Sequence, residues 1–194
     1  MANLITVARF PLLFLYLAAL YYGNQSILYW NVPFILFIFS LDSLDGWVAR
    51  RRGESSLLGS VLDIATDRTL EYVLWVIYAH LGLIPVIVPI IVIIRGTTVD
   101  AVRAVGMESG TSAFEQIQSP LNRFLVGSRF MRAIYGLAKG AAAGFLTLAY
   151  ALPESGGWFD LIYQTGIIFT WLSVFLCLVR GIPVLWEGVK SLSR

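Results

Sequence analysis

Long apolar segments recur along the whole chain, and they restrict what it can fold into. Hydrophobic residues make up 58% of the 194 residues and charged residues only 13%, against about 25% charged in soluble domains. Six segments approach the ~20 apolar residues that cross a bilayer, at roughly 8 to 22, 27 to 48, 57 to 79, 82 to 102, 130 to 152 and 160 to 180. We therefore predict an all-α integral membrane bundle of six transmembrane helices.

The rest of the composition excludes several classes of protein. Residues 1 to 194 show no internal repeat and no second soluble domain, so we expect a single membrane domain with a short juxtamembrane segment before the first span. The single cysteine, Cys177, excludes an intramolecular disulfide. A net charge of +2 is too small to indicate nucleic-acid binding. The first apolar segment lacks a basic start and an A-x-A-like site, so we expect a retained helix.

The distribution of arginine and lysine predicts the topology. The turns near 23 to 26, 80 to 82 and 153 to 159 contain neither residue. The opposite helix ends carry many of them, namely Arg50, Arg51, Arg52, Arg103, Arg123, Arg129, Lys190 and Arg194. This bias marks the cytoplasmic face, and an even number of spans puts both termini there. We expect a protein of the cell (inner) membrane.

Four aspartates lie within this apolar chain, in two pairs. Asp42 and Asp45 are three residues apart, and Asp63 and Asp67 are four apart, so each pair lies on one face of a helix. Ionisable groups at membrane depth are costly and normally serve ions, protons or substrates. Two facing helices can present four carboxylates to one small space, which predicts a site for Mg²⁺, Mn²⁺ or Ca²⁺.

The aspartates belong to a longer string, D-x-x-D-G-x-x-A-R-x8-G-x-x-x-D-x-x-x-D, which runs from Asp42 to Asp67. At every fixed position this string resembles the signature of the CDP-alcohol phosphotransferases, integral membrane enzymes of phospholipid synthesis. Residues 3 to 9 are also similar to the N-x-x-T-x-x-R that often opens members of that family. The resemblance implies a homodimer and a site that opens to the cytoplasm and the inner leaflet.

The resemblance also implies a reaction. An alcohol hydroxyl attacks the β-phosphoryl group of a CDP-linked lipid, here CDP-diacylglycerol, and CMP leaves. Asp42, Asp45 and Asp63 are assigned as metal ligands, and Asp67 as both a ligand and the general base. Two divalent ions, Mg²⁺ or Mn²⁺, can clamp the attacking and leaving oxygens. A base must in addition reach the acceptor hydroxyl.

Four other positions of the string are expected to bind the CDP-lipid. Gly46 and Gly59 remove side chains where the nucleotide approaches closely, and Ala49 does nearly the same. Arg50, one turn beyond Asp45, can offer a guanidinium fork to a phosphate.

The acceptor alcohol is less well determined. A basic set near the cytoplasmic side can hold an acceptor that carries its own phosphate, and it consists of Arg103, Arg129, Arg132 and Lys139. The chain looks most like phosphatidylglycerophosphate synthases, whose acceptor is glycerol 3-phosphate. Residues 130 to 152, however, lack the K-x-K-T-x-x-Q pattern of those enzymes. The Asp67-Arg68 pair is more similar to inositol-phosphate-transferring members, which makes a phosphatidylinositol phosphate synthase the alternative.

A divalent-cation carrier is the alternative from another functional class. Its polar groups should run through the full membrane depth, whereas the four aspartates are confined to one side.

Three further features carry expectations about structure. Glu71 continues the face of Asp63 and Asp67, so it either hydrogen-bonds within the site or pairs helices. Residues 104 to 128 form a polar stretch that serves as a lid or a connector. Gly181 and Pro183 are expected to interrupt the last helix.

Overall fold

The fold, taken from a computed structural model, is all-α in the part of the chain that is described. Residues 2–52, 57–108, 120–153 and 157–192 are described, although the side chains of residues 42–52 and of several residues beside the other gaps are not. The helices are α1 (Ala2–Tyr22), α2 (Gln25–Arg52), α3 (Leu57–His80), α4 (Ile87–Glu108), α5 (Pro120–Gly127), α6 (Arg129–Ala151) and α7 (Phe159–Leu192). The all-α class predicted from the sequence is confirmed.

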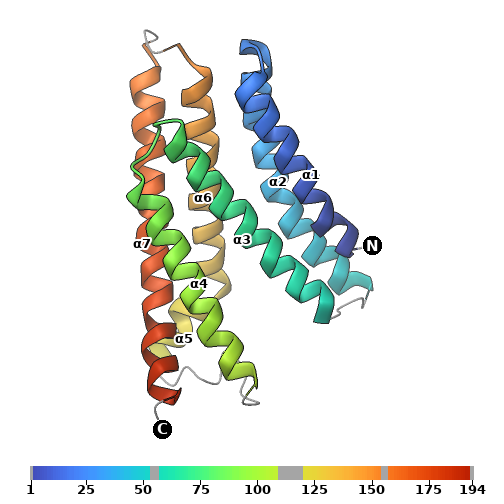
Figure 1. The fold of residues 1–194 in the computed structure, drawn as a ribbon, viewed down its shortest axis with the longest axis vertical. Coiled ribbons are helices and arrows are strands. Elements are labelled where there is room, and N and C mark those ends of the chain that lie inside the picture. The colour runs from blue at the N-terminus through green and yellow to red at the C-terminus, as the bar shows by residue number, and fades with distance from the viewer. Residues whose placement is uncertain (1, 53–56, 109–119, 154–156, 193–194) are drawn as a thin grey trace.

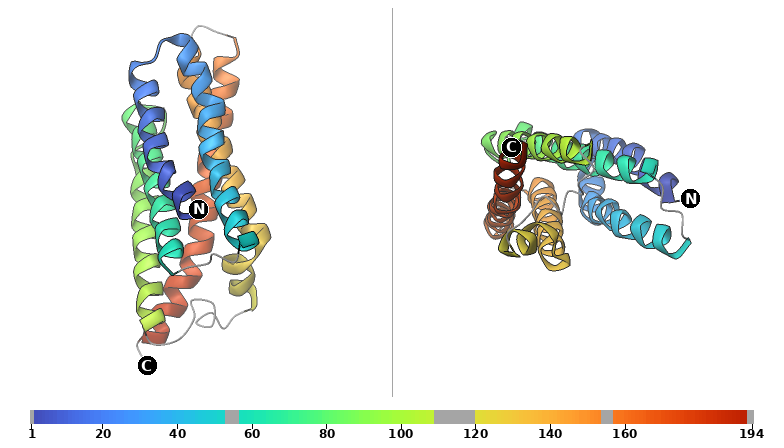
Figure 2. Two further views of the ribbon diagram at one scale, coloured as in Figure 1. Left: turned by 90° about the vertical axis from the view of Figure 1, so that its right-hand side faces the viewer. Right: turned by 90° about the horizontal axis from the view of Figure 1, so that it is seen from below.

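The long helices pack side by side in a closed ring. Around the ring, α1 contacts α2, α2 contacts α6, α6 contacts α7, α7 contacts α4, α4 contacts α3, and α3 returns to α1. Successive long helices run in opposite directions, so α1 starts and α7 ends on the side of the bundle where α2 and α4 end (Figure 1). The short α5 packs on α6 and α7 at that end of the bundle (Figure 2).

Apolar side chains occupy both the inside and the outside of the ring. The inner core includes Tyr16, Ile35, Leu74, Val88 and Leu146, one from each of five helices, all nearly inaccessible. Large apolar side chains also cover the outside, among them Phe14, Phe37, Ile94, Leu137 and Phe175. A bundle that is apolar on both sides suits a lipid solvent, which offers no hydrophobic reason to hide these groups.

One helix in the described part is long and apolar enough to cross a membrane, over Phe159–Gly188 of α7. Thr6–Tyr22 and Gln25–Leu41 are shorter apolar stretches, and the prediction of six spans is therefore not confirmed. The charged side chains within α3 and α4 account for part of the difference, because each of these helices carries several of them away from its ends.

One expectation about the last helix is wrong. Gly181 and Pro183 do not interrupt the last helix, because α7 continues to Leu192. A side chain added at Gly181 would collide with Arg95 of α4, so this glycine serves the close packing of α4 on α7. Where we expected a juxtamembrane segment the chain is already helical, since α1 is continuous from Ala2. The polar stretch 104 to 128 contains α5, and its residues 109–119 lie outside the described part.

Candidate functional site

The described half of the aspartate string lies in the first turns of α3. Asp63 and Asp67 are one helical turn apart, and their side chains are 48% and 44% exposed. Gly59 lies one further turn toward the start of α3 and is partly buried. Both carboxylates therefore lie on one helix and are nearly half exposed.

Arg9 of α1 meets both carboxylates. Its Nη2 donates a hydrogen bond of 2.8 Å to Oδ1 of Asp67, and its Nη1 lies 4.0 Å from Oδ1 of Asp63. The Arg9 side chain is only 2% exposed. A buried guanidinium between two partly open carboxylates holds α1 against α3 at this point.

The α2 half of the string lies outside the description of side chains. The backbone of α2 runs through these positions as a helix, but the side chains of Asp42, Asp45, Gly46, Ala49 and Arg50 are not described. Their roles as metal ligands and CDP-lipid contacts stay predictions.

The donor chemistry of α3 suits a hard divalent cation. Asp63 and Asp67 provide oxygen ligands of the kind that Mg²⁺ and Mn²⁺ prefer, and their exposure leaves room for a substrate phosphate. They are two of the four predicted ligands. Within the described residues no group of three or more possible ligands gathers, so the metal site stays a prediction that the residues present fit.

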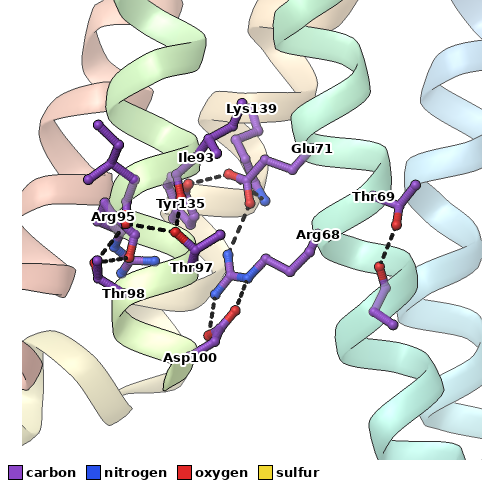
Figure 3. A network of polar contacts seen from close by, with 12 residues as sticks. Arg68, Thr69, Glu71, Ile93, Arg95, Thr97, Thr98, Asp100, Tyr135 and Lys139 are labelled. Atoms are coloured by element: carbon purple, nitrogen blue, oxygen red, sulfur yellow. Dashed lines mark hydrogen bonds and ion pairs between the residues drawn. The ribbon is translucent and has the colours of Figure 1, made fainter. Parts of the chain in front are cut away.

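A second carboxylate cluster lies one turn further along α3. Glu71 accepts a hydrogen bond from the Tyr135 hydroxyl, and its Oε1 lies 3.4 Å from Nζ of Lys139. Nη1 of Arg68 donates to its other oxygen over 3.2 Å, and the same guanidinium forks onto Asp100 of α4 at 2.6 and 3.0 Å. Figure 3 shows the network joining α3, α4 and α6.

Glu71 pairs helices and does not bond to the aspartates. Each step of four residues turns about 40° further around a helix of 3.6 residues per turn. Asp63 and Asp67 therefore face α1, whereas Glu71 has turned toward α4 and α6. Among the interactions described for Glu71, none is with Asp63 or Asp67.

The predicted acceptor residues differ in their burial. Lys139 points into the bundle as expected, with its Nζ 4.6 Å from the centre of the Tyr135 ring. Arg103 is partly buried on α4, and Arg129 and Arg132 are exposed at the start of α6. The set thus extends from the end of the bundle to the depth of Glu71.

Two arginines in the interior were not in the predicted set. Arg95 of α4 is only 8% exposed, and its Nε has no hydrogen-bond partner among the described residues. Arg180 of α7 also lies over the Tyr135 ring, 5.3 Å from its centre, and donates to the carbonyl oxygen of Val126. The positive charges of Arg95, Arg103 and Arg132 interact electrostatically with Arg180. The sequence carried one signal for Arg95, a charge within an otherwise apolar segment.

Comparison with known proteins identifies the family. The sequence model of the CDP-alcohol phosphatidyltransferases matches residues 1–179, which include the whole aspartate string. A CDP-diacylglycerol–inositol 3-phosphatidyltransferase from Arabidopsis thaliana is 47% identical over 45 residues. That match covers 23% of this chain and 20% of the plant protein, so it spans about a fifth of the length of this relative.

Proposed function

Because this chain belongs to the CDP-alcohol phosphatidyltransferase family of phospholipid biosynthesis, we propose that it transfers the phosphatidyl group of CDP-diacylglycerol to a polar alcohol that carries its own phosphate. The bond from the β-phosphorus to the acceptor oxygen forms, the bond to the CMP oxygen breaks, and CMP leaves. The observation that carries the proposal is the pair of half-exposed carboxylates, Asp63 and Asp67, on one face of α3.

The aspartates act at the diphosphate. Asp42, Asp45, Asp63 and Asp67 would hold Mg²⁺ or Mn²⁺, and a metal bound there would neutralise the charge that develops on the leaving CMP. Asp67 takes the proton of the attacking hydroxyl, a role that needs a carboxylate with an accessible face. Its 44% exposure supports this role.

The interior cations support an acceptor that is itself anionic. A guanidinium buried without a carboxylate partner is costly, and Arg95 has no such hydrogen-bonded partner among the described residues. Arg180 and Lys139 lie on the same Tyr135 ring. A phosphate held by arginines at this depth would stand one to two helical turns from Asp67, since four residues rise about 6 Å along a helix.

Two acceptors of this class compete. Glycerol 3-phosphate fits the general likeness of the sequence to phosphatidylglycerophosphate synthases. An inositol phosphate is favoured by the Asp67-Arg68 pair, whereas the plant relative, by its name, acts on inositol itself. Both share the phosphate that the basic residues would bind. The predicted cytoplasmic site and the homodimer remain part of this proposal.

A CMP-release assay tests the proposed function. Purified protein is given CDP-diacylglycerol with glycerol 3-phosphate, inositol phosphate, inositol, serine or choline. We expect release with a phosphorylated acceptor, loss of release in excess chelator, and recovery with Mg²⁺ or Mn²⁺. Full activity in chelator contradicts the metal role, and faster release with neutral alcohols contradicts the phosphorylated acceptor. Uptake of a divalent cation into vesicles without CMP release supports the carrier instead.

A further inference from the structure

Arg9 has no part in the mechanism above, yet it is among the most completely buried large side chains of the described chain. It lies on α1, far in sequence from the aspartate string, and reaches two members of that string on α3. Burying a charged side chain is costly unless its partners compensate. The contacts of Arg9 with Asp63 and Asp67 provide such compensation.

Each carboxylate side chain is partly exposed, Asp63 by 48% and Asp67 by 44%. Oδ1 of Asp67 accepts from Arg9 at 2.8 Å. Oδ1 of Asp63 is buried and lies 4.0 Å from the same guanidinium, although nearly half of that side chain is exposed. The exposed part of Asp63 therefore lies away from Oδ1. The guanidinium holds Oδ1 of Asp67 on the α1 side by a hydrogen bond and lies at ion-pair distance from Oδ1 of Asp63.

We propose that Arg9 is the positioning residue of the aspartate site: it fixes Oδ1 of Asp67 against α1 by a hydrogen bond and attracts Oδ1 of Asp63 to the same side, so that their other oxygens face the substrate. This inference rests on the proposed function and assigns Arg9 no contact with the substrate. Without the guanidinium, the two carboxylates are like charges one turn apart, which repel each other. Their side chains then adopt other rotamers.

Arg9 also opposes the metal electrostatically. A fixed positive charge beside the ligands repels divalent cations, so its removal should not weaken metal binding. Its removal should instead loosen the carboxylate that takes the proton. Misplacement of a reacting group by about 1 Å can cost about 100-fold in rate. The inference therefore predicts that turnover and metal affinity separate in Arg9 variants.

The test compares Arg9→Gln, Arg9→Lys and Tyr16→Phe with the wild type. Tyr16 bonds to Tyr78 of α3 over 3.1 Å, so Tyr16→Phe is a matched control that loosens the same pair of helices away from the aspartates. Each protein is measured for Mn²⁺ binding by electron paramagnetic resonance, for kcat of CMP release at saturating Mg²⁺, and for thermal unfolding in detergent.

We expect Arg9→Gln to bind Mn²⁺ at least as tightly as the wild type while its kcat falls about 10-fold to 100-fold. Arg9→Lys, which keeps the charge and one donor, should recover part of the kcat. If the kcat of Arg9→Gln equals that of Tyr16→Phe, the inference is overturned. A joint loss of Mn²⁺ binding and turnover in Arg9→Gln overturns it as well. If Arg9→Gln does not fold, the Mn²⁺ affinity and the kcat of Arg9→Lys test the inference in its place. A wild type that releases no CMP overturns the proposed function, and this inference with it.

Discussion

Two carboxylate clusters lie one helical turn apart on α3, and they differ in almost every physical respect. Asp63 and Asp67 are nearly half exposed, and Asp67 pairs with the Arg9 guanidinium of α1. Glu71 is 2% exposed, and its two oxygens face Tyr135, Lys139 and Arg68. The carboxylates of Asp63 and Asp67 are exposed to solvent, whereas the carboxylate of Glu71 is surrounded by side chains of the bundle.

The difference shows that carboxylates with the same spacing in the sequence can differ in function. What distinguishes them is how deeply each is buried and how many donors surround its oxygens. Residues 63, 67 and 71 follow one another at the same interval, and each could serve a cation. A carboxylate enclosed by cationic and hydroxyl donors stabilises the packing of α3 on α4 and α6, since breaking a buried ion pair is far more costly than keeping it. An open carboxylate stabilises less and can react.

The largest effect on activity is expected for Asp67→Asn. The amide oxygen can still accept from Arg9, so the fold should persist, but the side chain no longer takes a proton. We expect kcat to fall at least ~100-fold even at saturating Mg²⁺, a loss typical of removing a general base. Rate measurements over a range of Mg²⁺ check this, and recovery at high Mg²⁺ would show that Asp67 acts through metal occupancy instead.

Glu71→Gln should lower the stability of the protein more than its kcat, the reverse of what we expect for Asp67→Asn. Removing one partner of a buried ion pair costs about 3–5 kcal/mol, and because Arg68 keeps its fork onto Asp100, we expect a loss near the lower end. Thermal unfolding in detergent should reveal the loss, while kcat per folded molecule falls much less than in Asp67→Asn. Equal losses of kcat in the two variants would mean that the clusters act as one site.

Arg95→Gln tests whether the interior cations serve the acceptor. A hydrogen bond to a charged group contributes about 1.5–3 kcal/mol, so the KM for the phosphorylated acceptor should rise about 10-fold to 100-fold. The KM for CDP-diacylglycerol should stay constant. Lys190→Gln removes one charge near the end of α7 and serves as the control. An unchanged acceptor KM in Arg95→Gln would leave Arg95 a purely structural role.

The smallest effect is expected at the cluster of hydroxyl groups of Tyr16, Tyr78 and Thr147, which lies toward the end of the bundle away from the aspartates. Tyr78 bonds to Tyr16 and Thr147 at 3.1 and 3.0 Å, inside the core shared by α1, α3 and α6. Tyr78→Phe leaves partners that can still bond to each other, so we expect a loss of only about 1 kcal/mol and unchanged kcat. Thermal unfolding and CMP release measure both, and a drop in kcat would extend the site to this end.

Much of the architecture followed from residue patterns. The apolar segments predicted every long helix, because hydrophobic length is a local property of the chain. The aspartate string predicted the family, because it is a short arrangement along two helices. The continuation of α7 through Gly181 was missed, since a glycine that ends a helix and one that admits a neighbour look the same in sequence. Arg95 of α4 fills the space that Gly181 leaves.

The sequence by itself determined the helical class, the family and the face of α3 that carries Asp63 and Asp67. Only the tertiary structure decided that Arg9 meets those aspartates, that Glu71 turns away from them, and that Lys139 and Arg180 both lie over the Tyr135 ring. The physical reason is that periodicity fixes the direction of a side chain on its own helix. The partner it meets depends on how the helices are arranged in the bundle, and such contacts join residues as much as 131 positions apart.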